Sequence, residues 1–443
     1  MAKYEIKDGV GIIPEGTTNI ADRAFERCLD LKSVVIPKSV VKIGNNAFEQ
    51  CNMLTNIVIP NSVTQIGNRA FAYCNRLTSI VIPNSVTTIG YSSFSGCNGL
   101  RNVEFSENSQ LTRIEDFTFD GCNNLTSVTI PKSVKSIGYS AFGDCKGLTD
   151  IVIPDDIAYV HKNAFLGTPW FYTWYNNQPD GLVYIGRTLR DYKGNMPANT
   201  HLTVKEGTLT ILAYAFSKCS KLVSIKIPNS VNKIETGAFE GCCTLKSITI
   251  PKEVKNIADK TFSGCCALTK VKIPNGVTGI GALAFEKCSR LSQISIPNSV
   301  EEIGDYAFSG CSALSIVKIP NNLVKIGEGG FMGTSIRRVR IPQNINFIAD
   351  YAFANTKLRS IKIPEGVLGI GYSSFSGCPL LKKVVLSRSM GNLRKSAFNN
   401  CIAIRSIAVP TINVNYITQQ LPKELQQYVN ISLFNRILGL FKK

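Results

Sequence analysis

The stretch NSVTQIGNRAFAYCNRLTSIVIP, residues 61–83, decides the fold because the chain repeats it. KSVVKIGNNAFEQCNMLTNIVIP (38–60) precedes it, and NSVTTIGYSSF (84–94) follows it. A fixed period of roughly 20–50 residues is typical of stacked supersecondary units, since one unit cannot bury its apolar face without neighbours. The sequence therefore predicts a repeat solenoid.

Two markers count the repeats. The slot of the Ile/Val-Pro that closes each unit is filled 17 times, by Pro14, Pro37, Pro60, Pro83, Ser106, Pro131, Pro154, Lys205, Pro228, Pro251, Pro274, Pro297, Pro320, Pro342, Pro364, Ser387 and Pro410. A phenylalanine keeps the same register from Phe25 to Phe398. We expect about 17 coils forming one solenoid over residues 1–410.

Each unit contains two extended segments and a turn. In LTSIVIP (77–83) the apolar residues alternate with outward ones, which is the period-two pattern of a half-buried strand, and proline ends it. TTIG (87–90) is a second short strand stopped by glycine. YSSFSGC (91–97) is expected to form one helical turn whose Phe94 and Cys97 point inward.

The pattern IGxxAFxxCxxLxxIxIPxSV resembles the signature of the BspA-type leucine-rich repeat family over residues 10–410. The resemblance implies a leucine-rich-repeat-like solenoid with a parallel β-sheet on one face and short strands and helical turns on the other. Members are mostly bacterial, often Bacteroides-like, or protist surface proteins that bind other proteins or host matrix. The resemblance thus implies a binding or adhesion role without naming a partner.

The period breaks between Pro154 and Lys205, and the break holds both tryptophans, Trp170 and Trp174. GLVYIG and TLRDYKG within it indicate a hairpin. We expect an irregular aromatic hairpin insertion over residues 166–203. It is either a substitute coil that keeps the stack closed, or a protruding loop that presents the tryptophans as binding anchors.

After Pro410 the repeat stops, and apolar residues recur near helical spacing at Leu421, Leu425, Tyr428, Val429, Leu433, Ile437 and Leu440. We predict a C-terminal amphipathic capping helix within residues 411–443, because the open end of a repeat array needs a cap. The alternative is that this basic tail, ending at Lys443, lies on a membrane surface.

Thirteen of the 15 cysteines share one register: Cys28, Cys51, Cys74, Cys97, Cys122, Cys145, Cys219, Cys242, Cys265, Cys288, Cys311, Cys378 and Cys401. We expect these ladder cysteines to be reduced, buried and to act as small hydrophobic residues. Cys243 and Cys266 each follow a ladder cysteine, so we expect them at the surface of adjacent coils, where a disulfide depends on backbone geometry.

Signatures of catalysis and metal binding are lacking in the sequence. The two histidines, His161 and His201, have no companion pattern, the cysteine doublets lack CxxC spacing, and no GxxxxGK[ST] occurs. We therefore expect no enzyme, no cofactor and no metal site.

The sequence leaves the compartment open. No apolar run reaches the roughly 18 residues of a membrane span, and residues 1–16 lack the pattern of a signal peptide. The chain is therefore either cytoplasmic or has lost its signal peptide, whereas the family resemblance implies the cell surface or secretion. We expect a monomer.

Net charge is +18 and is uneven, with 15 Lys/Arg and 16 Asp/Glu in residues 1–168 against 34 and 15 in residues 169–443. The outward residue just before the final Ile/Val of each strand changes in the same way, from mainly apolar in the first part of the chain to frequently basic in the second. The candidate partner-binding residues are the apolar Val35, Val58 and Val81, the basic Lys226, Lys270, Lys272, Lys318, Arg338, Arg340, Lys362 and Lys383, and Trp170 and Trp174.

Three functions fit this pattern. The first is a non-enzymatic protein-binding or adhesion solenoid that binds a protein ligand, acidic ligands included, on its exposed strand face. The second is a binder of nucleic acid or another polyanion through the basic C-terminal part. The third is a structural cell-surface spacer, in which valine merely suits a strand and lysine merely solvates an edge.

Overall fold

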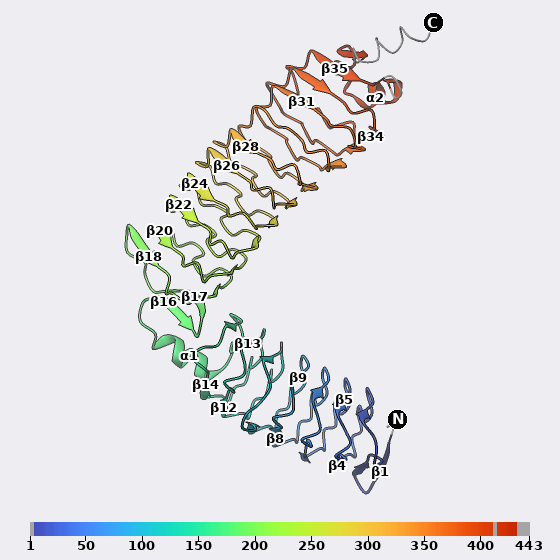
Figure 1. The fold of residues 1–443 in the computed structure, drawn as a ribbon, viewed down its shortest axis with the longest axis vertical. Coiled ribbons are helices and arrows are strands. Elements are labelled where there is room, and N and C mark those ends of the chain that lie inside the picture. The colour runs from blue at the N-terminus through green and yellow to red at the C-terminus, as the bar shows by residue number, and fades with distance from the viewer. Residues whose placement is uncertain (1–3, 411–413, 432–443) are drawn as a thin grey trace. The chain divides into compact units, whose positions relative to one another are not determined.

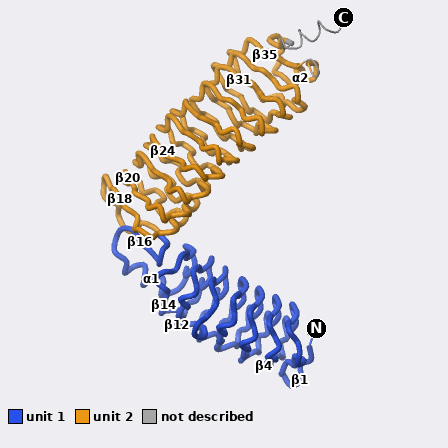
Figure 2. The backbone as a smooth tube through the Cα atoms, viewed as in Figure 1, with its two compact units in different colours: residues 1–190 blue, residues 191–443 orange. Residues whose placement is uncertain are grey.

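A computed structural model describes residues 4–410 and 414–431. The chain forms a parallel β-solenoid of about 18 turns, which confirms the predicted fold class. It divides into two compact units, unit 1 (Met1–Arg190) and unit 2 (Asp191–Lys443) (Figures 1 and 2). Most coils supply one strand before the closing proline, here called the first strand, and a two-residue second strand before the glycine.

In unit 1, β1 (Glu5–Lys7) pairs antiparallel with the initial first strand, and the first strands then pair in parallel in two successive sheets. These first strands are β2 (Val10–Ile12), β4 (Ser33–Val35), β6 (Asn56–Ile57), β8 (Ser79–Ile82), β10 (Asn102–Phe105), β12 (Ser127–Thr129) and β14 (Asp150–Val152). The second strands are β3 (Asn19–Ile20), β5 (Lys42–Ile43), β7 (Gln65–Ile66), β9 (Thr88–Ile89), β11 (Arg113–Ile114), β13 (Ser136–Ile137) and β15 (Tyr159–Val160).

Unit 2 repeats the arrangement. Its first strands are β18 (Thr200–Thr203), β20 (Leu222–Lys226), β22 (Ser247–Thr249), β24 (Lys270–Lys272), β26 (Gln293–Ser295), β28 (Ile316–Lys318), β31 (Ser360–Lys362), β33 (Lys383–Val385) and β35 (Ser406–Val409). Its second strands are β19 (Thr210–Ile211), β21 (Lys233–Ile234), β23 (Asn256–Ile257), β25 (Gly279–Ile280), β27 (Glu302–Ile303), β29 (Lys325–Ile326), β30 (Phe347–Ile348), β32 (Gly369–Ile370) and β34 (Asn392–Leu393). Residues 334–342 occupy the first-strand register of a shortened coil without forming a strand.

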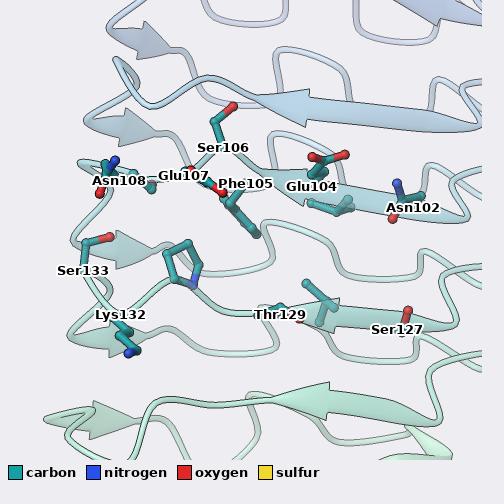
Figure 3. Close-up of a pocket in the computed structure, with 14 residues that line it drawn as sticks. Asn102, Glu104, Phe105, Ser106, Glu107, Asn108, Ser127, Thr129, Lys132 and Ser133 are labelled. Carbon is teal, nitrogen blue, oxygen red and sulfur yellow. The ribbon is translucent and has the colours of Figure 1, made fainter.

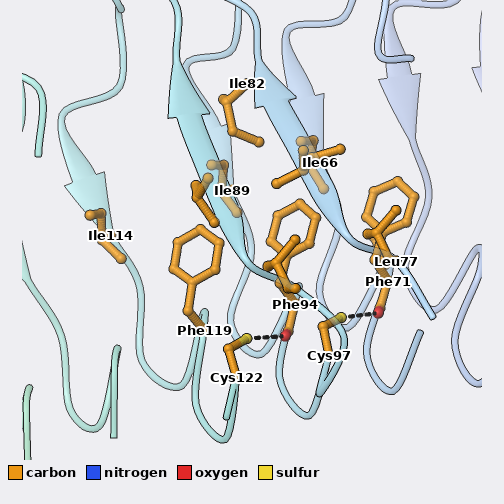
Figure 4. Packing of buried hydrophobic residues seen from close by; sticks show 14 of the residues in the cluster. Ile66, Phe71, Leu77, Ile82, Ile89, Phe94, Cys97, Ile114, Phe119 and Cys122 are labelled. Atoms are coloured by element: carbon orange, nitrogen blue, oxygen red, sulfur yellow. Dashed lines mark hydrogen bonds between the residues drawn. The ribbon is translucent and has the colours of Figure 1, made fainter. Parts of the chain in front are cut away.

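The core is a ladder of equivalent residues, as predicted. Phe71 and Phe94 are fully buried, and their ring centroids lie 5.2 Å apart with nearly parallel planes (Figure 4). The ladder cysteines support it with a hydrogen bond between coils: the Cys97 thiol donates to the Phe71 carbonyl oxygen at 3.1 Å. Burial raises the pKa of Cys97 to about 12, so the thiol stays protonated and able to donate.

Eleven ladder cysteines are buried, while Cys28 and Cys219 are only partly buried. Both belong to coils that lack a regular preceding coil: Cys28 lies in the initial coil, and Cys219 follows the insertion. The two exceptions therefore mark the places where the ladder begins.

The segment around each phenylalanine forms turns, and no helix is assigned there in the described residues. Arg69 and Tyr73, two residues before and after Phe71, have φ of 54° and 60°, which interrupts any right-handed helix. Their N–H groups point instead to the next coil, donating to Tyr91 O at 2.9 Å and Ser95 O at 2.8 Å. These bonds make the turns a third hydrogen-bonded column along the solenoid.

Glycine before this turn permits close stacking. A Cβ atom on Gly67 would lie 2.6 Å from the carbonyl carbon of Gly44 in the preceding coil. Any side chain would therefore push the coils apart, which explains the recurring Ile-Gly.

The insertion contains a helix that the sequence analysis did not predict, α1 (Pro169–Asn176). Thr168 caps it by accepting the Phe171 N–H at 3.1 Å, and proline fills the first helical position. The neighbouring strands β16 (Gly181–Ile185) and β17 (Thr188–Lys193) follow, joined by two residues.

The C-terminal segment differs from the single amphipathic helix expected within residues 411–443. Its described part contains α2 (Val414–Gln420), α3 (Lys423–Gln426) and β36 (Val429–Ile431). Pro422 stands between the helices, since it cannot continue α2, and the β-branched Val429 favours a strand. β36 pairs in parallel with β35 and adds a rung beyond the 17 expected. Residues 432–443, with Leu433, Ile437, Leu440 and Lys443, lie outside the described residues.

Ile417 and Leu425 are buried in this segment. Within the described ranges, no helix combines the length and the hydropathy that crossing a bilayer requires.

Candidate binding surface on the strand face

The outward side chains of the first strands, here called the strand face, form the candidate surface. Successive strand residues point to opposite sides, so Val34, Ile57 and Ile80 are buried in the core. Their neighbours Val35, Val58 and Val81 are 69%, 72% and 48% exposed. The predicted outward direction of this column is thus confirmed.

Val35 and Val58 line a shallow depression of about 680 Å³ between β4 and β6. Lys38, Asn61 and Ser62, from the turns after the closing prolines, form its polar end. This part of the strand face is an apolar floor bounded by polar groups.

A second depression of about 570 Å³ lies farther along unit 1, where the closing proline is replaced by Ser106 (Figure 3). Glu104 on β10 lies next to Val81 of β8 in the ladder and interrupts the valine column. Glu107 and Lys132, both from turns, also line this hollow. The strand face of unit 1 therefore changes from apolar to mixed charge.

The basic candidates of unit 2 are all exposed: Lys226, Lys270, Lys272, Lys318, Arg338, Arg340, Lys362 and Lys383. Arg338 and Arg340 lie on the irregular segment 334–342 and not on a strand. Lys270 and Lys318 line a depression of about 600 Å³, together with Ile316, which is 63% exposed.

Sequence analysis missed five further exposed basic residues of this face: Lys246, Arg337, Arg359, Lys382 and Arg405. They directly follow the buried Leu or Ile that opens each LxxI pattern. This position also faces outward, so reading it down the coils would have found them.

Trp170 and Trp174 are half-buried and pack against the core of unit 1. The Trp170 ring meets Phe165 edge-on at 4.9 Å and stacks on Trp174 at 5.6 Å between centroids. Arg190 lies 4.4 Å from the Phe171 ring centroid and covers the helix further. Of the two readings of the insertion, this packing favours a substitute coil over protruding anchors.

Cys243 and Cys266 are exposed, as expected, and both are free thiols. In other coils the same position carries asparagine, and Asn75 donates to Asn52 Oδ1 of the preceding coil at 3.1 Å. Side chains at this position thus approach one another closely. Among residues 4–410 and 414–431, no group of three or more His, Cys, Asp or Glu side chains is placed to hold a metal ion.

The two histidines serve local structure. His161 Nδ1 accepts the Asn163 N–H at 3.1 Å, and its ring meets Tyr139 edge-on. His201 Nδ1 lies 2.6 Å from Ser224 Oγ on the neighbouring first strand.

A family model described as BspA type leucine rich repeat region matches residues 11–110, 97–170, 194–315 and 302–427. The chain belongs to the BspA-type leucine-rich repeat family. This membership confirms the resemblance found in the sequence. The matched segments include every strand-face candidate named above and Trp170, whereas Trp174 lies outside them.

Solved structures of similar proteins include two from bacteria. A leucine-rich repeat protein from Bacteroides ovatus is 28% identical, with 85% of this chain and 78% of that chain covered and a TM-score of 0.37. A leucine rich cell surface protein from Faecalibacterium prausnitzii is also 28% identical, with 78% and 82% covered and a TM-score of 0.36. No curated protein matches the chain. BspA-type solenoids are generally non-enzymatic, and leucine-rich repeat proteins commonly bind proteins.

Proposed function

We propose that this chain is a non-enzymatic protein-binding solenoid that contacts its partner through the strand face of unit 1. The observation that carries the proposal is the column of Val35, Val58 and Val81, whose apolar side chains are exposed on consecutive coils. Contiguous exposed apolar side chains on a folded protein are typical of interaction sites.

The column suits recognition for a second reason. Valine has few side-chain rotamers, and strands of a stacked sheet move little, so binding loses little conformational entropy. Complete burial of a valine stabilises by about 1.5–3 kcal/mol, so three together supply on the order of 5 kcal/mol. The polar end at Lys38 and Ser62 adds hydrogen-bonding groups beside the apolar floor.

Photo-crosslinking tests the proposal. A photoreactive amino acid is placed at position 58 in the full chain and, as a control, at position 41 in a second sample. Val41 is 43% exposed in the same unit but lies beside β5, away from the first strands. We expect a discrete crosslinked protein from position 58 in cell lysate or matrix extract, and none of that species from position 41.

The captured protein is then purified and titrated against V35T/V58T/V81T, in which threonine keeps the β-branched shape. We expect affinity to fall about 100-fold, because burying three hydroxyl groups in an apolar contact costs several kcal/mol. Val41→Thr should leave affinity unchanged. Equal crosslinking from both positions, or an unaffected triple variant, would refute the proposal and favour the spacer.

A further inference from the structure

We propose that the strand face of unit 2 binds a linear anionic polysaccharide. This site is separate from the protein-binding surface of unit 1, so each proposal stands or fails by its own experiment.

All of the net charge lies in unit 2. Residues 1–190 contain 17 Lys/Arg and 17 Asp/Glu, whereas residues 191–443 contain 32 and 14, which leaves +18 on unit 2. A cationic excess confined to one unit attracts polyanions to that unit.

Within unit 2 the excess of basic over acidic residues is more complete on the strand face than over the unit as a whole. Nine coils between Leu222 and Pro410 present three outward positions each, and these 27 positions hold 13 basic residues and no acidic one. The six coils between Leu31 and Pro154 in unit 1 present 18 such positions, with two basic and two acidic residues. The acidic residues of unit 2 are thus kept off this face.

The 13 basic side chains are exposed, and among them Arg405 also donates to the Ile402 and Ile404 carbonyl oxygens. The ion pairs in the described part of unit 2 use lysines elsewhere, such as Lys233 with Glu235 at 2.7 Å and Lys287 with Glu286 at 2.9 Å. Basic side chains on neighbouring coils repel one another when the same face holds no acidic residue, and a bound polyanion would relieve that repulsion.

The residues between the charges select the kind of polyanion. Ten of the remaining 14 positions are Ser, Thr or Gln, which can hydrogen-bond sugar hydroxyl groups, and none of the 27 is aromatic. A surface for single-stranded nucleic acid would need aromatic rings on which bases stack. An acidic protein would need apolar anchors, and Ile316 is the large exposed apolar side chain that the described strand face of unit 2 offers.

The dimensions fit a polymer. Neighbouring strands lie about 4.8 Å apart, so nine coils extend over roughly 40 Å. The depression of about 600 Å³ is lined by Lys270, Gln293, Ser295 and Lys318, so it extends over the three coils of β24, β26 and β28. Such a row of charges and hydroxyl groups matches repeated sulfate or carboxylate groups along a sugar chain.

Binding of the full chain to heparin, polygalacturonate and neutral dextran tests the proposal at about 0.15 M salt. Two charge-matched variants accompany it, K272E/K318E/K362E on the strand face and K255E/K325E/K395E, whose exposed lysines lie on or beside second strands. We expect binding to heparin, polygalacturonate or both but not dextran, and a loss of about 100-fold in the strand-face variant. The control variant should lose less than about fivefold, although its net charge is the same.

A duplex DNA, a single-stranded oligonucleotide and polyglutamate serve as competing probes. Tighter binding of either nucleic acid would overturn the proposal in favour of a nucleic-acid surface, and tighter binding of polyglutamate in favour of an acidic protein partner. Equal losses in both triple variants would show that net charge alone attracts the polymer. Circular dichroism confirms that both variants fold.

Discussion

Replacing a phenylalanine inside the ladder should destabilise unit 2 more than replacing the one at its end. Phe285 lies between Phe262 and Phe308, with ring centroids 5.3 and 5.2 Å away. Phe398 stacks on Phe375 at 5.4 Å, and the described segment beyond it supplies no ring to its other side. Both side chains are buried, at 0% and 1% exposure.

Truncation of a buried phenylalanine to alanine costs about 3–5 kcal/mol, chiefly through lost transfer energy and the remaining cavity. An aromatic pair at this spacing contributes about 0.5–1.5 kcal/mol beyond its buried area. Phe285→Ala breaks two pairs and Phe398→Ala breaks one. We therefore expect Phe285→Ala to lower the free energy of unfolding by about 0.5–1.5 kcal/mol more.

Urea unfolding followed by circular dichroism measures this difference. Phe285→Leu and Phe398→Leu remove the ring but keep more of the side-chain volume than alanine does, so this pair should preserve the difference while reducing both losses. Because repeat arrays can unfold in parts, hydrogen exchange of coils 262–308 and 375–410 should accompany the melts. Equal losses at the two positions would refute ring stacking as a separate contribution and leave only volume.

Three further predictions concern the thiols and the C-terminal segment. At pH 7.5 a thiol reagent should modify Cys243 and Cys266 rapidly and the buried ladder cysteines only after denaturation; several disulfides among the ladder positions would contradict the thiol ladder. Burial raises the pKa of Cys97 and Cys265 to about 12 from 9.0. The contribution of these two protonated thiols to the free energy of unfolding is therefore complete below pH 9 and is lost as pH rises towards 12. The loss is about 1.4 kcal/mol per pH unit for each thiol. Urea melts with reductant between pH 8 and 10.5 should show this loss, and Cys97→Ala should reduce its slope. Deleting residues 421–443 should lower the melting temperature by at least about 2 °C, because it removes the buried Leu421 and Leu425 from the last coil; an unchanged melting temperature with lost liposome binding would support membrane attachment instead.

The 23-residue period made the core predictable. Phe71, Cys97 and Val81 each take their inward or outward direction from a repeat in which every coil meets a copy of itself. The turns around Phe71 were not predictable as such, because left-handed residues such as Arg69 are stabilised by hydrogen bonds to the next coil and have no local signature.

In the insertion, where the 23-residue period is interrupted, the structure was not fully predicted from the sequence. The helix at Pro169 had a local signal in Thr168, but the burial of Trp170 depends on the exposed end of a preceding stack. Within the candidate surface, outward direction followed from alternation alone. The full extent of the basic face was not predicted, because the prediction followed only one of the three outward positions of each coil along the whole chain.

The bond from each of the eleven buried ladder thiols to the phenylalanine carbonyl of the preceding coil has a consequence for how such chains change. Cys97 meets Phe71, and Cys122 meets Phe94, through the same atoms although the second coil is two residues longer. The seam between coils is therefore generic, and any coil can in principle dock on any other. In-frame recombination that duplicates or deletes a whole coil would preserve these contacts between coils. It would change only the order of the outward residues, so the exposed surface can vary while the core stays the same.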